Sequence, residues 1–537
     1  MLGSIIAIIV YLFVITFLGY LGFKHTKTST DYLIGGRQIH PMIMALSYGA
    51  TFISTSAIVG FGGAAGTLGM GLLWLTVLNI LFGIFIAFVV FGKRTRRMGH
   101  NLDAHTFPEL LGNRFNSKFI QGFAGVVIFL FMPIYTAAVL KGGADFIQTH
   151  FGISYEVSLL FFAAVVAVYV WMGGMKGVMY TDAFQGAIMF IGMAFLIIFV
   201  YNKLGGITNA HEQLNQLYNK PEIQEQTAGL IKGGFRGWTS MPASGSPIWW
   251  SLVTTIVMGV GIGVLAQPPL VVRFMTVKSN RELNRAVVSG GVFILMMTGV
   301  AFVVGSLSNV LFFNETGKVA ILAAGGNDKI IPMFIKQFVP SWFGIVFFLA
   351  LIAAAMSTLS SQFHAMGTAV GRDVYEKALG KKGNSILITR TGILLAILLS
   401  VILAYLANKL DSSMQIIATG TALFFGLCAA SFLPGYVAAL YVRKISTKSV
   451  IIGMITGFVI GVFWIFFIHE KEASSLQLCM ALFNKTSIVK DTALAKLALV
   501  DPIVVALPAS AIVTFIGALT TKNTLSENHL DKCFNGI

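Results

Sequence analysis

The chain has 537 residues, of which only 11% are charged (37 Lys and Arg, 21 Asp and Glu) and 56% are hydrophobic. A soluble domain is about 25% charged, so this composition excludes an ordinary soluble protein, and its hydrophobicity excludes a disordered one. The three cysteines, Cys428, Cys479 and Cys533, are scattered without metal-ligand or redox spacing, which excludes a disulfide scaffold. A polytopic membrane protein is the class that remains.

Apolar segments long enough to span a bilayer recur along the whole chain. A transmembrane helix needs about 20 largely apolar residues. Thirteen segments meet this requirement: 4–23, 41–70, 72–92, 119–147, 156–172, 182–202, 248–272, 287–313, 341–370, 387–408, 412–441, 449–468 and 501–520. An odd number of spans predicts that the two termini lie on opposite sides of the membrane.

The net charge of +16 fits a membrane protein whose basic residues gather on one side. Nucleic-acid binding would also require a basic surface, but Lys and Arg crowd the cytoplasmic loops of helical bundles. Most of the Lys and Arg residues fall in alternate loops, for example at 93–97 and at Arg273, Lys278, Arg281 and Arg285. We therefore expect no nucleic-acid partner. We expect a multi-pass protein of the plasma (inner) membrane lipid bilayer, with its N-terminus outside and its C-terminus cytoplasmic.

The second span is rich in hydroxyl groups and glycine, which favours a break in its helix. Ser47, Thr51, Ser54, Thr55 and Ser56 cluster near its middle and glycines follow. The carbonyls of an unwound helix can coordinate a cation, and the ends of the half-helices can face a solute. Tight packing of helices through small residues is the alternative explanation.

The ninth span carries Ser357, Thr358, Ser360 and Ser361 within five residues, next to Gln362. Ser357 and Ser361 lie on one helix face, while the other two hydroxyls point elsewhere. Each hydroxyl could bond to its own i−4 carbonyl. Four of them together favour a polar cavity, whose oxygen atoms would suit a hard cation.

Two further features break the membrane pattern. Asp182 opens the sixth span, where it is either an acidic residue favoured by the helix dipole or the carboxylate of a cation site. In the seventh span, three glycines precede Gln267, Pro268 and Pro269, which predicts a second broken helix five spans after the first. Motifs of nucleotide-binding or soluble catalytic proteins are absent from the sequence, so we expect neither an enzyme nor a primary pump.

In combination, three motifs resemble the sodium/solute symporter family, over nearly the whole chain. They are segment 50–54, segment 356–361 with 372–375 after it, and the loop 169–176, which departs from the family pattern at Gly177. The resemblance implies an all-α membrane protein with a ten-helix core of two inverted five-helix repeats, the leucine-transporter fold. The implied parts are a first helix and loop (1–40), the first repeat (41–202), an outer loop (203–247), the second repeat (248–441), and two flanking helices with a cytoplasmic tail (442–537).

The same resemblance implies that Na⁺ is the coupling ion and that no organic cofactor is needed. The main sodium site would consist of the carbonyls of Ala50, Ile53 and Ala354 and the hydroxyls of Ser357 and Thr358. A second sodium ion would bind at Asp182, Ser357, Ser360 and Ser361.

The function implied is sodium-coupled import of a small organic solute by alternating access. The positions at which sugar carriers place polar side chains look like Phe52, Ala57, Gly259 and Ile262, which argues against a sugar. Segments 51–58 and 266–268 are more similar to the pantothenate and proline carriers, although Phe52 replaces the proline carriers' aspartate. We expect a small carboxylate or amino-acid-like solute, such as pantothenate, proline or a monocarboxylate, bound at Ser54, Thr55, Ser56 and Gln267. The alternative is a sensor or an uncoupled ion channel on the same scaffold.

Overall fold

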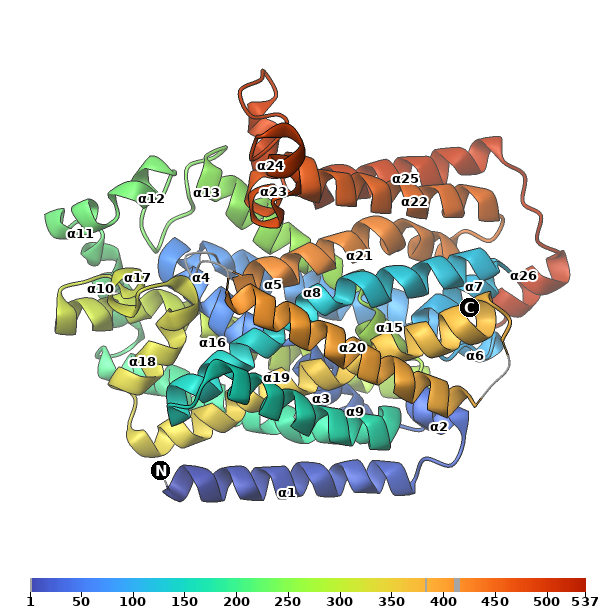
Figure 1. Ribbon diagram of the computed structural model, residues 1–537, viewed down its shortest axis with the longest axis horizontal. Coiled ribbons are helices and arrows are strands. Elements are labelled where there is room, and N and C mark those ends of the chain that lie inside the picture. Colours follow the sequence, from blue (N-terminus) through green and yellow to red (C-terminus); the bar gives the residue numbers. More distant parts are fainter. Residues whose placement is uncertain (1, 382–383, 410–415) are drawn as a thin grey trace.

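The computed structural model describes residues 2–381, 384–409 and 416–537, and all secondary structure in these ranges is helical. Long helices lie side by side in a bundle, and shorter helices cover both of its ends (Figure 1). Eleven helices are long and apolar enough to cross a membrane, or up to 12 if the bent pair Pro41–Phe52 and Ser56–Leu68 is one span. Residues 412–415 of the eleventh predicted span lie outside the described residues. Helices are expected in this setting because a bilayer core offers no water to bond an exposed backbone.

The first half of the chain supplies the broken second span and the long helices that surround it. Its elements are α1 (Leu2–Lys24), α2 (Ser29–Ile34), η1 (Gly35–Arg37), α3 (Pro41–Phe52), η2 (Ser56–Gly60), α4 (Phe61–Leu68), η3 (Met70–Leu72), α5 (Leu73–Ile80), η4 (Leu81–Gly92), α6 (Lys93–Asn101), α7 (Phe107–Arg114), α8 (Lys118–Phe151) and α9 (Tyr155–Lys203).

The second half supplies the most buried spans. Its spanning and connecting elements are α13 (Pro247–Trp250), η5 (Ser251–Val260), α14 (Gly261–Gly263), η6 (Val264–Ala266), α15 (Pro268–Phe274), α16 (Asn280–Thr316), α17 (Ala320–Ala324), η7 (Asn327–Lys329), α18 (Ile330–Phe338), α19 (Ser341–Thr368), η8 (Ala369–Ala378), α20 (Ser385–Asn408), α21 (Ile416–Tyr441), α22 (Thr447–Phe463), η9 (Trp464–Ile468), α25 (Pro502–Thr520) and α26 (Glu527–Phe534).

The predicted spans 156–172 and 182–202 lie on either side of a kink in α9. Helix α9 covers 49 residues, but it consists of two helices that meet at Gly174, whose backbone is not helical (φ 55°, ψ −159°). Glycine adopts this left-handed φ without steric cost. The two spans are therefore separate helices, and the loop expected at 173–181 is reduced to the kink at Gly174, with residues 175–181 helical.

The interior of the bundle is formed by α19 and α21. Helix α19 packs against α9, α8, α20 and α3, and α21 packs against α22, α25, α8 and η5. By contrast, α1 lies on the outside against α9, and α22 and α25 pack on one another at the opposite edge. The polar residues of the second and ninth spans therefore meet in the centre of the molecule, away from lipid.

The two ends of the bundle differ in their elements. Helices α2, α6, α7 and α26 gather at one end, which we call the basic end because the basic cluster 93–97 lies in α6 (Figure 1). Segment 203–247 lies at the other end as α10 (Ile207–Leu217), α11 (Pro221–Gln226) and α12 (Ala228–Lys232). It is anchored there by Trp238, whose buried indole N–H donates to the Gly66 carbonyl at 2.8 Å. Segment 469–500 forms α23 (Glu470–Leu476), α24 (Leu478–Phe483) and η10 (Ala495–Leu499).

A close contact between glycines holds α4 against α16. A Cβ atom built on Gly305 would lie 2.0 Å from the Gly62 carbonyl oxygen, so the two backbones touch at this point. The glycines of the second span thus serve close packing, in addition to the break in its helix.

We expect Gly305→Ala to destabilise the protein by about 1–3 kcal/mol, because the added methyl forces the two helices apart. The matched control is Gly299→Ala on the same helix, where a Cβ meets no atom within 4 Å. This control should lose no stability, since alanine favours a helix over glycine. Melting temperatures in detergent measure the difference, and equal values for the two variants would contradict the contact.

Candidate cation and solute site

The second span is broken where its hydroxyl groups cluster. Helix α3 ends at Phe52, Ile53 is extended (φ −90°, ψ 95°), and the helix resumes at Ser56 with a bend of 53° between the two halves. The hydroxyl of Ser54 accepts a hydrogen bond from the backbone N–H of Ser56 at 3.1 Å. This is how a serine begins a helix, by satisfying an N–H that has no partner within it.

Hydroxyl groups of α19 meet the carbonyls that the break leaves free. The last carbonyls of a helix have no partner within it. The Ser357 hydroxyl donates to the carbonyl of Ala50 at 2.9 Å and to that of Ala354 at 3.2 Å, and the Thr358 hydroxyl donates to Thr51 at 3.1 Å. Two carbonyls expected in the main sodium site, those of Ala50 and Ala354, thus lie within hydrogen-bond reach of a third expected member, the Ser357 hydroxyl.

The other two residues of that predicted site are placed differently. The hydroxyl of Thr358 bonds to the Thr51 carbonyl, which the sequence analysis did not include. Ile53 lies at the break itself, and its N–H donates to Gly49 at 2.8 Å. Among the described residues, the hydrogen bonds of Ser357 and Thr358 do not reach the Ile53 carbonyl.

Asp182 is fully buried on α9 and contacts both α3, which ends at the helix break, and the continuous helix α19. Its carboxylate accepts hydrogen bonds from Ser360 at 3.0 Å and Ser361 at 3.2 Å on α19, and from Ser47 at 2.9 Å and Thr51 at 3.2 Å on α3. We call the side chains of Ser47, Thr51, Asp182 and Ser361 the Asp182 cluster. Ser357 was also predicted for the second sodium site; among its described hydrogen bonds, its carbonyl accepts from the Ser360 hydroxyl at 2.9 Å.

A buried arginine that the sequence analysis assigned to a basic loop completes this cluster. Arg273 has no exposed surface, and its Nη2 lies 2.8 Å from Oδ2 of Asp182. The same nitrogen donates to Ser361 at 2.6 Å and to Thr51 at 2.5 Å, and Nε donates to Ser47 at 3.0 Å. The loop assignment was wrong because Arg273 lies on α15, which follows the extended residue Gln267 and packs against α3 and α19. Removing one partner of such a buried pair typically costs about 3–5 kcal/mol.

A small cavity beside the break is the candidate solute site. Its volume is about 10 Å³, and its walls include Phe52, Ser54 and Asn79, with other lining residues Ile53, Ala57, Phe61, Leu75, Val260, Thr298, Phe302, Thr421 and Phe425. All of the lining side chains are uncharged. The Oδ1 atom of Asn79 is buried and has no hydrogen-bond partner among the described residues, which marks a polar group free to bind a solute.

The lining of this cavity includes Ser54 but not the other three predicted solute residues. The hydroxyl of Thr55 instead donates to the Val139 carbonyl at 3.4 Å. Ser56 and Gln267 are buried, and within the described parts of the chain the Ser56 hydroxyl and Nε2 of Gln267 have no partner. Asn79 was missed because a lone amide in an apolar span carries no sequence signal of its own.

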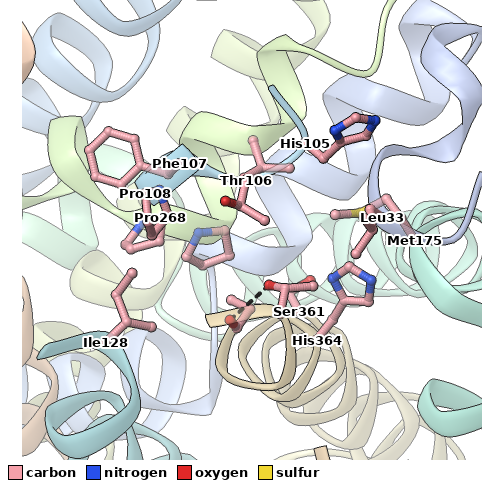
Figure 2. Close-up of a pocket in the computed structure, with 14 residues that line it drawn as sticks. Leu33, His105, Thr106, Phe107, Pro108, Ile128, Met175, Pro268, Ser361 and His364 are labelled. Atoms are coloured by element: carbon pink, nitrogen blue, oxygen red, sulfur yellow. Dashed lines mark hydrogen bonds between the residues drawn. The ribbon is translucent and has the colours of Figure 1, made fainter. Parts of the chain in front are cut away.

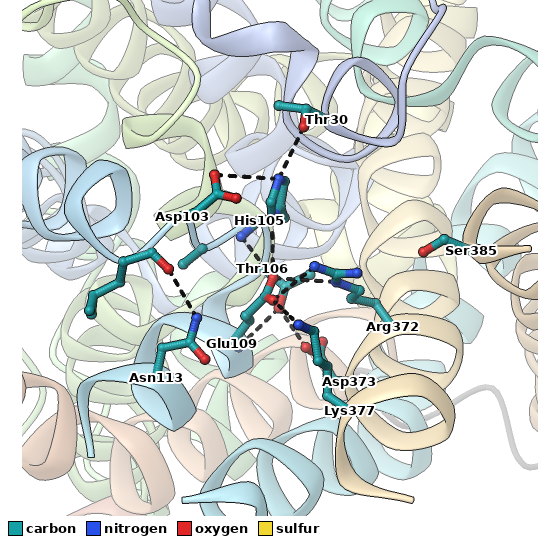
Figure 3. Close-up of polar contacts among 12 residues, drawn as sticks. Thr30, Asp103, His105, Thr106, Glu109, Asn113, Arg372, Asp373, Lys377 and Ser385 are labelled. Atoms are coloured by element: carbon teal, nitrogen blue, oxygen red, sulfur yellow. Dashed lines mark hydrogen bonds and ion pairs between the residues drawn. The ribbon is translucent and has the colours of Figure 1, made fainter. Parts of the chain in front are cut away.

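The basic end is held together by a second set of buried ion pairs, which we call the basic-end network (Figure 3). Glu109 on α7 accepts from Arg372 at 3.0 Å and lies 3.4 Å from the Lys377 ammonium. The hydroxyl of Thr106 donates to Asp373 at 2.6 Å. Burial acts to raise the pKa of Glu109, but His105 and Arg372 outweigh it and lower this pKa to about 2.

A cavity of about 20 Å³ lies between the Asp182 cluster and the basic-end network (Figure 2). Ser361 and His364 of α19 border it on one side, and Thr106 borders it on the other. Pro268 and Pro269 of α15 complete its wall. The space is large enough for about one water molecule.

Comparisons with known proteins match most of the chain. The model of the sodium:solute symporter family matches residues 32–457. The chain is 28% identical over 473 residues to sodium/proline symporter 2 of Staphylococcus saprophyticus, covering 86% of each chain, and 28% identical over 477 residues to the sodium/proline symporter of Staphylococcus aureus, covering 86% of this chain and 85% of the relative. It shares its fold with a Na⁺-coupled sialic acid symporter solved in a substrate-bound outward-open state (TM-score 0.72, 19% identity, 97% of this chain and 98% of that one).

We expect protonation of Glu109 to loosen the basic-end network. Its pKa is about 2 in the folded protein against an ordinary 4.5, so its ionised form stabilises the fold above pH 4.5. That contribution, on the order of 3 kcal/mol, is lost as the pH falls from 4.5 towards 2. The melting temperature should therefore fall more steeply on acidification in the wild type than in Glu109→Gln, which has no carboxylate to protonate. Parallel curves of melting temperature against pH for the two proteins would contradict this role of Glu109.

Proposed function

Because this chain belongs to the sodium:solute symporter family and so couples sodium to the movement of a small solute, we propose that it imports a small carboxylate or amino-acid-like solute. Proline, pantothenate and monocarboxylates are the candidates. The observation that carries the proposal is the meeting of the Ala50 carbonyl with the Ser357 hydroxyl, 2.9 Å apart, at a helix break in the centre of the bundle.

We propose that the main sodium ion binds at this break, to the carbonyls of Ala50, Ile53 and Ala354 and the hydroxyls of Ser357 and Thr358. Hard cations prefer oxygen ligands of this kind. A hydroxyl that now donates to a carbonyl can rotate and offer a lone pair to an ion. The ion would thereby replace hydrogen bonds that currently join α3 to α19, and its binding would fix the two helices relative to each other.

We propose a second sodium ion at Asp182, Ser357, Ser360 and Ser361. The contacts of Ser360 and Ser361 with the buried carboxylate support it. Each charge that crosses 100 mV supplies about 2.3 kcal/mol, so two ions supply about 4.6 kcal/mol. This is enough for a roughly thousandfold accumulation of a neutral solute. The scheme needs only the ions and the membrane potential, with no organic cofactor.

The chemistry of the residues around the solute cavity supports a small solute with an apolar body, for which the cavity of about 10 Å³ would have to widen. Phe52, Phe302 and Phe425 supply aromatic walls, and Asn79 and Ser54 supply hydrogen-bonding groups. Since the lining has no charged side chain, a solute carboxylate would be balanced by sodium, not by an arginine. A polyhydroxylated sugar would leave most of its hydroxyls facing apolar walls, at a cost for each unpaired group.

The proposed architecture follows the same family. Counting α9 as two crossings on either side of Gly174, and the bent pair as one, gives thirteen spans and a ten-helix core of two inverted repeats. The basic end would face the cytoplasm of the plasma membrane, by the positive-inside rule. Transport would then require the basic-end network to open, so that the solute and the ions leave towards α2 and α7.

Loss of a hydroxyl at the break should weaken sodium binding. We expect Ser357→Ala and Thr358→Ala each to raise the half-saturating sodium concentration for uptake by about tenfold or more, because each variant loses roughly one charge-assisted contact with the ion. Ser400→Ala is the control, because Ser400 is equally buried but donates only to the Ala396 carbonyl of its own helix. Unchanged sodium dependence in the first two variants would refute the main site.

Uptake in proteoliposomes identifies the solute and tests the coupling. Labelled proline, pantothenate, a short monocarboxylate and sialic acid are each presented with an inward sodium gradient and with none. We expect one of the first three to accumulate above its external concentration only with the gradient. Current without accumulation would instead indicate an uncoupled channel.

A further inference from the structure

A positively charged side chain already occupies the place proposed for the second sodium ion. The Nη2 atom of Arg273 lies 2.8 Å from Oδ2 of Asp182 and 2.6 Å from the Ser361 hydroxyl, two of the oxygens that the ion would use. Both charged residues are fully buried. The guanidinium therefore neutralises the carboxylate as the ion would.

We infer that Arg273 and the second sodium ion are alternative occupants of the Asp182 cluster, and that each displaces the other during transport. The inference rests on the proposed second sodium site. A single buried carboxylate balances one positive charge, and two cations around it would repel each other strongly where water does not screen them. Sodium entry thus requires the guanidinium to withdraw.

The position of Arg273 in the chain allows such a withdrawal. It lies on α15, a seven-residue helix that follows the extended residue Gln267 (ψ 116°). Pro268 and Pro269 open this helix, and neither has a backbone N–H to join it to the preceding turn. Helix α15 can therefore shift relative to η6 without breaking a continuous ladder of hydrogen bonds.

The surroundings of α15 offer both space and a second carboxylate. Pro268 and Pro269 of α15 line the cavity of about 20 Å³, which extends from Ser361 to Thr106 (Figure 2). Thr106 donates to Asp373, whose Oδ2 atom is buried and lacks a hydrogen-bond partner within the described ranges. A positive charge that leaves Asp182 in this direction would thus approach another acidic group.

This exchange would link ion occupancy to the basic end. In the structure Arg273 ties α15 to α3, α9 and α19, and α15 packs against α7, the helix that carries Glu109. Sodium that displaces Arg273 frees α15 from the cluster. When the ion leaves, the guanidinium returns and keeps the empty carboxylate neutral, which opposes rebinding of sodium from the cytoplasm.

Equilibrium binding of ²²Na⁺ to the purified full-length protein tests the exchange. We expect Arg273→Gln to lower the half-saturating sodium concentration of the Asp182 site by about tenfold or more, because a competing charge is removed. The half-saturating sodium concentration of Arg273→Lys should lie between those of Arg273→Gln and the wild type, since lysine keeps the charge but not the planar fork. The control is Arg285→Gln, since Arg285 is a basic residue on the exposed face of α16. This variant should bind sodium as the wild type does.

The outcomes separate the two proposals. If Asp182→Asn removes one bound sodium but neither Arg273 variant tightens its binding, the second site stands and the exchange is refuted. If Asp182→Asn leaves the number of bound ions unchanged, the second site itself fails, and the exchange with it. If Arg273→Gln does not fold, Arg273→Lys decides alone, and a half-saturating sodium concentration equal to or above that of the wild type refutes the exchange.

Discussion

The structure depends on how a broken helix satisfies its backbone inside a membrane. The break after Phe52 leaves carbonyl groups in the last turn of α3 with no partner in their own helix, and in the bilayer core no water is available to bond them. The hydroxyls of Ser357 and Thr358 donate to two of these carbonyls, those of Ala50 and Thr51. Some of these oxygens belong to the proposed sodium site, so under that proposal an ion would replace contacts that now join α3 to α19.

A second constraint is the neutrality of the buried interior. Asp182 lies among four hydroxyl groups and the guanidinium of Arg273, and every one of these groups donates a hydrogen bond to it or to a neighbour. A carboxylate at this depth is stable only with a positive charge beside it. In the structure the guanidinium of Arg273 supplies this one positive charge.

The two ends of the molecule are built from different interactions. At the basic end, α7 is joined to η8 through the ion pairs of Glu109, while at the other end Trp238 and the short helices α10–α12 lie over the bundle. The ion pairs of Glu109 are electrostatic, whereas the contact between the glycines of α4 and α16 is steric. The cavities beside the break and beside α15 lie between these two layers.

The sequence by itself determined the membrane class, the broken second span, and the residue types that gather around it. These follow from local physics, since hydrophobic length sets a span, and hydroxyls and glycines within one weaken its helix. It also placed Asp182 near Ser360 and Ser361 through a family resemblance. The sequence did not reveal Arg273, Asn79 or Glu109 as parts of these sites, nor that a kink at the single residue Gly174 would join the two halves of α9. Those features depend on which helices touch across hundreds of residues. Only tertiary packing decides whether an arginine after a proline pair turns out to water or back to a buried carboxylate.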